Sequence, residues 1–239
     1  AGAMKQGIKR LYDTVAVSRR APSEFLIHLD GRPLKTPAKE MLVLPTEELA
    51  FGIAVEWEKQ GATLRPDTMP LMKLATTAVD QVPQIRPTMT DSMLRCLDCD
   101  AACFRSADEP KLLAKEEERF SPLLGWLRDT HNIELAMSTS LTLRHSPFSL
   151  ARAEVLLAEA DDWEISALDF CTSACKSFVI ALALCYNHIG AEQALAAARV
   201  GEQYQIDEWG EVEAGHDLDE ADLAVRMSAA STFMRMLHK

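Results

Sequence analysis

The chain has 239 residues, of which 48% are hydrophobic and 26% charged, and its net charge is −11. These fractions are typical of a globular protein and exclude a collagen-like or disordered chain. Residues 1–86 carry 12 Lys and Arg against 10 Asp and Glu, whereas residues 87–239 carry 13 against 26. Because an acidic surface repels phosphate, we expect no nucleic-acid partner.

The six cysteines match no secreted disulfide framework, which indicates a reducing compartment. The sequence shows neither a secretory signal nor an Arg-rich transit segment. Its longest strongly apolar stretch, residues 177–187, is too short to span a bilayer. We therefore expect no membrane insertion, and we also expect a monomer.

The first third of the chain predicts strands, turns and two helices. Aliphatic, aromatic and β-branched runs favour strands at residues 11–17, 25–29 and 41–44, with a hairpin turn at Asp30-Gly31. Thr46 is a plausible cap for a helix that ends near Gly61. A second helix is predicted over residues 71–82. Pro83 ends this helix, and the two prolines at positions 83 and 87 indicate a domain boundary.

Helical periodicity dominates after this boundary. It predicts helices over residues 110–128, 146–160, 164–189, 191–204 and 218–237, and short strands at 102–105 and 133–137. The helix over 164–189 is apolar on nearly all sides, so we expect it at the centre of the bundle. The predicted class is α+β: a small mixed α/β N-terminal domain (5–85) followed by a mainly helical C-terminal domain (86–239).

The sequence contains no glycine-rich phosphate loop, no nucleophile elbow and no zincin helix. We therefore expect no enzymatic activity and no cofactor. Two clusters keep a metal-dependent hydrolase or a redox enzyme open as the alternative. Cys96, Cys99 and Cys103 could offer three thiolates, and Glu211, Glu213 and His216 could bind a metal or transfer protons. Buried free thiols and a solvated acidic face explain the same residues without chemistry.

Residues 202–222 contain nine Asp and Glu and no Lys or Arg, together with Trp209. Tryptophan is enriched in binding hot spots, and surface charge can steer a partner. Asp217 with Glu220 also resembles a capping box for the last helix. We expect a partner-binding surface formed by Glu208, Trp209, Glu211, Glu213, His216 and Asp217.

The segment EWGEVEAGHDLDEADL, residues 208–223, closely resembles the C-terminal signature of the mitochondrial ATP synthase assembly factors that chaperone the alpha subunit. Ala214 stands where that family commonly has the first of two glycines. Four other segments resemble the same family in order: residues 28–50, residues 54–82 with Trp57 and Asp80, LDCDAACFR (97–105, with Phe104 in place of Tyr), and SPLLGWL (121–127) with Trp126.

The resemblance implies a two-domain chaperone that binds the free alpha subunit of the ATP synthase catalytic head before the alpha–beta ring assembles. It also implies the mitochondrial matrix, or the cytoplasm of a related bacterium. We expect Trp57, Asp80 and Trp126 to be structural. For Trp57, the helical spacing of Leu49, Ile53 and Trp57 supports this role independently of the resemblance.

Overall fold

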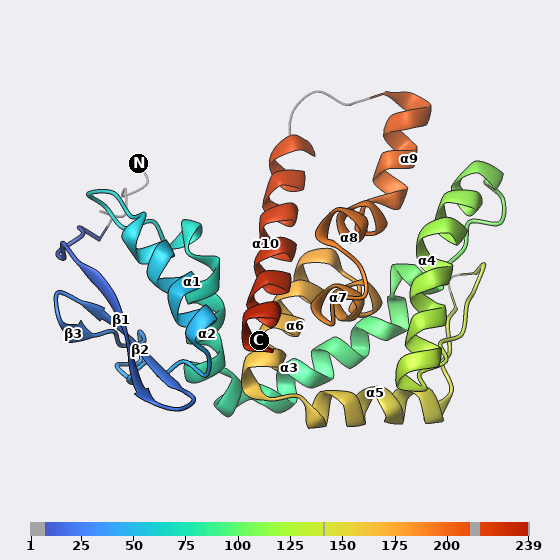
Figure 1. Cartoon of the computed structure of the whole chain (residues 1–239). Coiled ribbons are helices and arrows are strands. Elements are labelled where there is room, and N and C mark those ends of the chain that lie inside the picture. The colour runs from blue at the N-terminus through green and yellow to red at the C-terminus, as the bar shows by residue number, and fades with distance from the viewer. Residues whose placement is uncertain (1–7, 141, 211–215, 239) are drawn as a thin grey trace, which may run out of the picture.

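The computed structural model describes residues 8–140, 142–210 and 216–238, with the backbone alone for 216–218. A small sheet lies at one end of the molecule, and helices form the rest (Figure 1). The predicted α+β class is therefore confirmed. No helix in the described part of the chain combines the length and apolarity needed to cross a membrane.

The sheet is antiparallel and contains β1 (Val15–Ala21), β2 (Glu24–Leu29) and β3 (Arg32–Pro33) in that order. The predicted Asp30-Gly31 turn is confirmed, with φ of 48° and 76° at its two residues. A two-residue hairpin turn of type I′ requires positive φ at both of its central residues. The strand predicted at 41–44 is wrong, because that segment makes only isolated bridges to residues 25 and 35.

Two helices follow the sheet in the chain and contribute to the core next to it. Helix α1 (Glu47–Glu58) begins where predicted, with the Thr46 hydroxyl accepting a hydrogen bond from Leu49 N. The Thr46 hydroxyl also donates to the carbonyl of Met236 at 2.6 Å. After a 3₁₀ turn (Pro66–Thr68), helix α2 (Pro70–Asp80) buries its apolar face against the helical bundle.

Residues 83–87, where the domain boundary is predicted, belong to helix α3 (Val82–Cys96). The helix is kinked at Ile85, where φ is −125° and ψ is 15°. Pro83 lies in the first turn, where its missing N–H costs nothing, and Pro87 follows the kink. One hydrophobic core runs continuously from the sheet into the bundle. The division into two domains at this point stays a prediction.

The remaining bundle is more segmented than the periodicity predicted. It contains α4 (Pro110–His131), α5 (Pro147–Glu159), α6 (Asp162–Cys175), α7 (Phe178–Cys185), α8 (Ala191–Ala198), α9 (Val200–Trp209) and α10 (His216–Leu237). Two 3₁₀ turns (Leu97–Cys99 and Ala101–Cys103) precede α4. The predicted strands at 102–105 and 133–137 are wrong, since only a single bridge joins Phe104 to Ser138.

The single long helix predicted over 164–189 is also wrong. Lys176 takes a left-handed conformation (φ 56°) that ends α6, and Ser177 caps α7. The helix predicted over 191–204 is likewise divided, at Arg199, into α8 and α9. The expectation of a central apolar element is nevertheless confirmed, because every residue of α7 is buried.

Candidate functional site

The last turn of α9 carries the most exposed aromatic side chain in the described part of the molecule. Trp209 is 76% exposed, and its ring makes an edge contact with Tyr204, at a centroid distance of 6.3 Å. Gly210 follows with a positive φ of 83° and ends the helix. In Figure 1, α9 lies at the side of the bundle opposite α5, and it packs against α4. Trp209 therefore faces solvent instead of filling the core.

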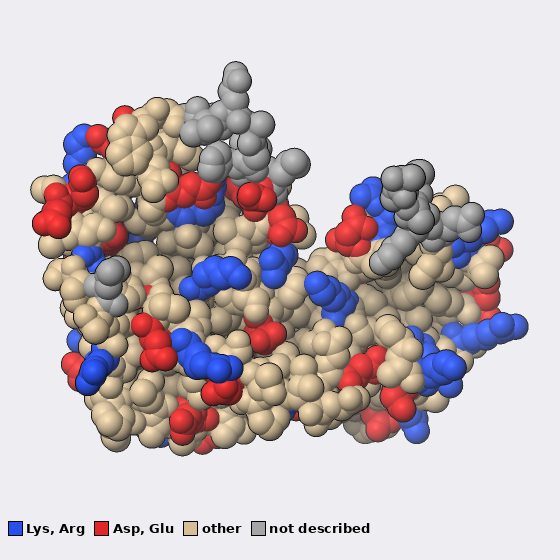
Figure 2. Space-filling view, turned by 180° about the vertical axis from the view of Figure 1, so that it is seen from behind, with Lys and Arg blue, Asp and Glu red and all other residues tan. Residues whose placement is uncertain are grey.

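The acidic segment is partly neutralised within the chain itself. Lys111 of α4 donates to the Glu208 carboxylate at 2.6 Å, and Lys115, one turn later on α4, pairs with the neighbouring Asp207. Arg199 pairs with Glu220 of α10 and, at 2.8 Å, with Glu202. Figure 2 shows Lys and Arg interleaved with Asp and Glu on the face that it presents. The sequence missed these cations because they lie on other helices or just outside the segment.

The other predicted partner-binding residues have no described side chains. Glu211 and Glu213 lie outside the described residues. His216 and Asp217 lie in the first turn of α10, for which the backbone alone is described. Their roles in partner binding and in helix capping therefore stay predictions.

The three cysteines of the trio lie in different environments. Cys103 is buried, Cys96 is partly buried and Cys99 is exposed. Burial, with a smaller effect of the nearby Asp100, raises the pKa of the Cys96 and Cys103 thiols to about 12. In the metal-free protein these two thiols therefore stay protonated, whereas thiolate is the form that binds metal. The described residues contain no group of three His, Cys, Asp or Glu side chains arranged to hold an ion.

The segment around Cys103 instead organises the core. Asp100 is fully buried, and one of its carboxylate oxygens accepts from the Ser177 hydroxyl at 2.6 Å and Ala102 N at 3.1 Å. Its other oxygen accepts from Val179 N at 3.1 Å. The carboxylate thus caps the N-terminus of the buried helix α7, and burial raises its pKa despite these hydrogen bonds.

Arg105 completes this segment on the opposite side. Its side chain is only 4% exposed and pairs with Glu117 of α4 at 2.8 Å. It also donates to the carbonyls of Ala102 and Phe104, at 2.9 and 2.7 Å. The sequence motif LDCDAACFR therefore has a structural explanation, since Asp100 and Arg105 tie it to α7 and α4.

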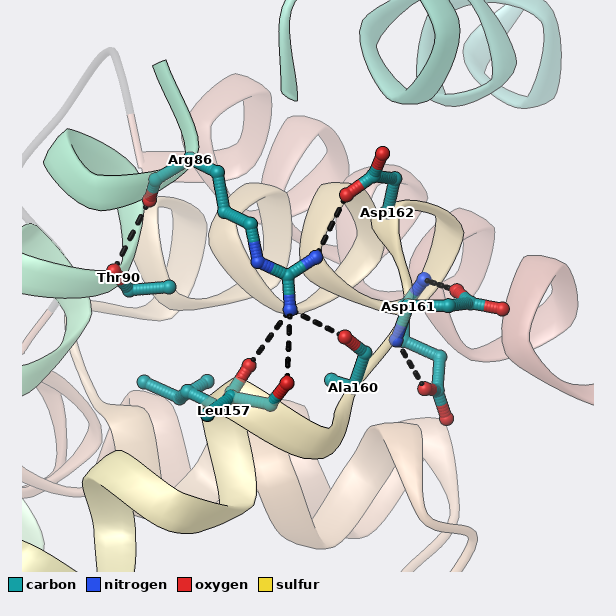
Figure 3. Close-up of polar contacts among 8 residues, drawn as sticks. Arg86, Thr90, Leu157, Ala160, Asp161 and Asp162 are labelled. Atoms are coloured by element: carbon teal, nitrogen blue, oxygen red, sulfur yellow. Dashed lines mark hydrogen bonds and ion pairs between the residues drawn. The ribbon is translucent and has the colours of Figure 1, made fainter. Parts of the chain in front are cut away.

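A second polar junction lies at the kinked start of α3. The guanidinium of Arg86 donates to Asp162 at 2.7 Å and to the carbonyl of Leu157 at 3.0 Å (Figure 3). The same group contacts the carbonyl of Ala160, at the end of α5. Asp162 is the first residue of α6. Arg86, near the start of α3, therefore contacts the end of α5 and the start of α6. Its positive charge also stabilises the C-terminus of α5. The sequence analysis did not predict this role of Arg86, because it interpreted only the neighbouring prolines.

The three residues expected to be structural make different contacts. Trp57 is partly buried against the core and makes an edge contact with the Tyr12 ring, at 5.6 Å. Asp80 accepts a hydrogen bond from Ala38 N at 3.1 Å and so connects the end of α2 to the loop before α1. Trp126 stacks on His188, with ring centroids 4.6 Å apart. Trp57 is thus only partly buried, and whether the three are needed for folding stays a prediction.

Comparison with known proteins agrees with this architecture. The family described as ATP12 chaperone protein matches residues 9–128. "Protein atp12, mitochondrial" from Schizosaccharomyces pombe is 27% identical, over 90% of this chain and 78% of its own length. The Saccharomyces cerevisiae protein of the same name is 20% identical, over 93% and 82%.

Solved structures extend the likeness over the whole fold. Atp12 from Paracoccus denitrificans superposes with a TM-score of 0.89 at 25% identity, covering 96% of this chain and 98% of the other. The Atu1473 protein from Agrobacterium tumefaciens gives 0.87 at 29% identity, covering 96% and 86%. The match of the family to half of the sequence, and of the fold to nearly all of it, shows that the chain belongs to the ATP12 chaperone family.

Proposed function

We propose that this protein is a non-enzymatic assembly chaperone that binds the unassembled alpha subunit of the ATP synthase catalytic head. Membership of the ATP12 chaperone family supports the chaperone role. A subunit destined for a large obligate interface exposes apolar surface while it is alone. Covering that surface until the proper partner arrives prevents aggregation and requires no hydrolysis.

The observation that supports the location of the client site is the exposure of Trp209. Large aromatic side chains are usually covered, and tryptophan is strongly enriched among binding hot spots. Trp209 stands at the end of α9, directly before the acidic residues Glu211 and Glu213. We propose that Glu208, Trp209, Glu211, Glu213, His216 and Asp217 form the client-binding surface.

A binding experiment with purified subunits tests the client and the surface separately. The chain is immobilised and presented with the isolated alpha subunit or the isolated beta subunit. We expect retention of alpha only, and an alpha complex that dissociates at least about tenfold faster for Trp209→Ala, as for a central hot-spot residue. Leu11→Ala is the matched control, because Leu11 is 83% exposed but lies beside the sheet, and it leaves binding unchanged. Equal retention of beta would exclude the proposed client, and equal dissociation of both variants would move the site elsewhere.

The acidic residues are tested by removing charge without changing shape. The triple change of Glu208, Glu211 and Glu213 to Gln should slow association and flatten its dependence on salt. The control changes Glu40, Glu154 and Glu159 to Gln, because these exposed residues lie on other elements. If both triple variants show the salt dependence of the unchanged protein, the acidic segment does not steer the client.

We place this activity in the mitochondrial matrix, with the cytoplasm of a related bacterium as the alternative. Two relatives are named mitochondrial, while similar solved structures come from bacteria. Fractionation of the source cells, with detection of the native protein, distinguishes the two compartments.

A further inference from the structure

A basic pocket of about 890 Å³ lies far from Trp209, between the end of α4 and the beginning of α5. Its lining contains three arginines and one carboxylate: Arg128, Arg144, Arg152 and Glu134. The C-terminal part of the chain carries twice as many acidic as basic residues. Three arginines in one pocket therefore contrast with the acidic composition of this part of the chain.

The arginines of this pocket make few hydrogen bonds and ion pairs with the described part of the chain. Arg144 is exposed, and the described residues offer it no hydrogen-bond or ion-pair partner. Arg152 makes one long hydrogen bond, 3.5 Å from its Nη2 to the carbonyl of His131. Its Nε atom is buried, with no partner in the described part of the structure. Arg128 is paired, but with its exposed sequence neighbour Asp129. Guanidinium donors thus remain available for an incoming acceptor.

The wall of the pocket is fixed, and its rim is apolar. The His145 ring accepts from Ala136 N at 3.2 Å, and its Nε2 donates to the carbonyl of Leu97 at 2.8 Å. Ser149 donates to the carbonyl of Glu134 at 2.6 Å, which holds the loop on the first turn of α5. At the rim, the ring of Phe148 is 67% exposed. Arginine donors beside an exposed aromatic ring suit an extended segment that presents both carboxylates and an apolar side chain.

We propose that this pocket is a second interaction site, which binds an acidic peptide segment of a partner protein. Arg144 and Arg152 bind its carboxylates, and Phe148 packs against a flanking apolar residue. Charge complementarity favours this occupant, and the compact shape fits a short segment. A long nucleic acid is a poorer fit, because its phosphates would extend beyond the pocket over an acidic protein. The proposal does not depend on the identity of the client bound near Trp209.

Fluorescence anisotropy with a labelled Glu-rich peptide containing one Phe tests the pocket on the full chain. We expect saturable, salt-sensitive binding that is lost when every Glu of the peptide is replaced by Gln. Arg144→Glu should weaken binding roughly five- to tenfold, since it removes one attraction and adds a repulsion. Phe148→Ala should weaken it without changing the salt dependence. Arg32→Glu is the control, because it makes the same charge change at an exposed position on β3, at the other end of the molecule (Figure 1).

Several results would overturn the proposal. The Arg144→Glu and Arg32→Glu variants could bind the peptide with equal affinity, or the protein could bind the Glu and Gln peptides equally well. The protein could also bind a single-stranded RNA oligonucleotide more tightly than the acidic peptide. Displacement of the peptide by inorganic phosphate at equal concentration would reduce the site to a simple anion site. Circular dichroism and thermal melting of each variant separate a loss of binding from a loss of folding. None of these measurements uses the alpha subunit, so failure here leaves the proposed function standing.

Discussion

Replacing Asp100 by Ala tests whether the buried carboxylate holds α7 in place. The change removes the acceptor of three hydrogen bonds, two of them from the backbone amides of Ala102 and Val179. An unpaired buried donor costs about 1–3 kcal/mol. The Ser177 hydroxyl can rotate to another acceptor, whereas the amides cannot. The raised pKa of Asp100 shows that burying its charge is itself unfavourable, which offsets part of the loss. The expected net destabilisation is about 2–4 kcal/mol.

Urea denaturation and thermal melting measure this loss. A destabilisation of that size should lower the melting temperature of a chain this long by roughly 5–15 °C. Asp100→Asn should lie between Ala and the unchanged protein. It keeps the oxygen that serves Ser177 and Ala102, but it can place its amide NH₂ against Val179 N. Asp98→Ala, at an exposed position two residues earlier, should change stability by less than about 0.5 kcal/mol. If Asp100→Ala and Asp98→Ala are equally stable, the carboxylate does not support α7.

Three further changes probe the same framework. Burial raises the pKa of Glu56 to about 7, so the folded state retains a proton that the unfolded state releases, and stability should fall as pH rises from about 4.5 to 7. Glu56→Gln should flatten this decline, as followed by urea denaturation across the range, and an unchanged slope would contradict the burial effect. Arg86→Ala should lower the free energy of unfolding, measured by urea denaturation, by about 2–3 kcal/mol. The control Arg95→Ala, which breaks an exposed ion pair, should lower it by less than about 0.5 kcal/mol. Equal losses would show that the three helix ends do not need the Arg86 guanidinium. Trp57→Ala should cost about 2 kcal/mol in a thermal melt, less than a fully buried tryptophan, and Trp57→Phe should recover about half; no loss for Ala would show that the ring is dispensable.

Features set by neighbouring residues were predictable from the sequence. The Thr46 cap, the Asp30-Gly31 turn and the start of α5 at Pro147 each depend on side chains within a few positions of the feature. The hydrophobic period located most helices for the same reason. The motif around residues 208–223 also predicted the family correctly, although half of that segment lies outside the described side chains.

Features set by distant residues were not predictable. The break between α6 and α7 depends on Ser177, whose partner Asp100 lies 77 positions earlier. The helix at residues 83–87, where two prolines predicted a boundary, carries Arg86, which bonds to groups more than 70 positions away. Periodicity carries no information on such pairings. The same limit applies to Glu208, whose charge is balanced by a lysine 97 positions before it.

The hydrogen bond from Thr46 to the carbonyl of Met236 has a consequence for synthesis on the ribosome. The two residues are 190 positions apart, and the Met236 sulfur lies so close to Gly52 that a side chain at that position would displace it. The surface of α1 that faces α10 therefore has no cover until translation has passed Met236 and the last turn has emerged from the exit tunnel. Elongation at roughly 5–20 residues per second keeps that surface bare for about ten seconds or more. During that interval the nascent chain itself presents the kind of unfinished apolar face that chaperones recognise.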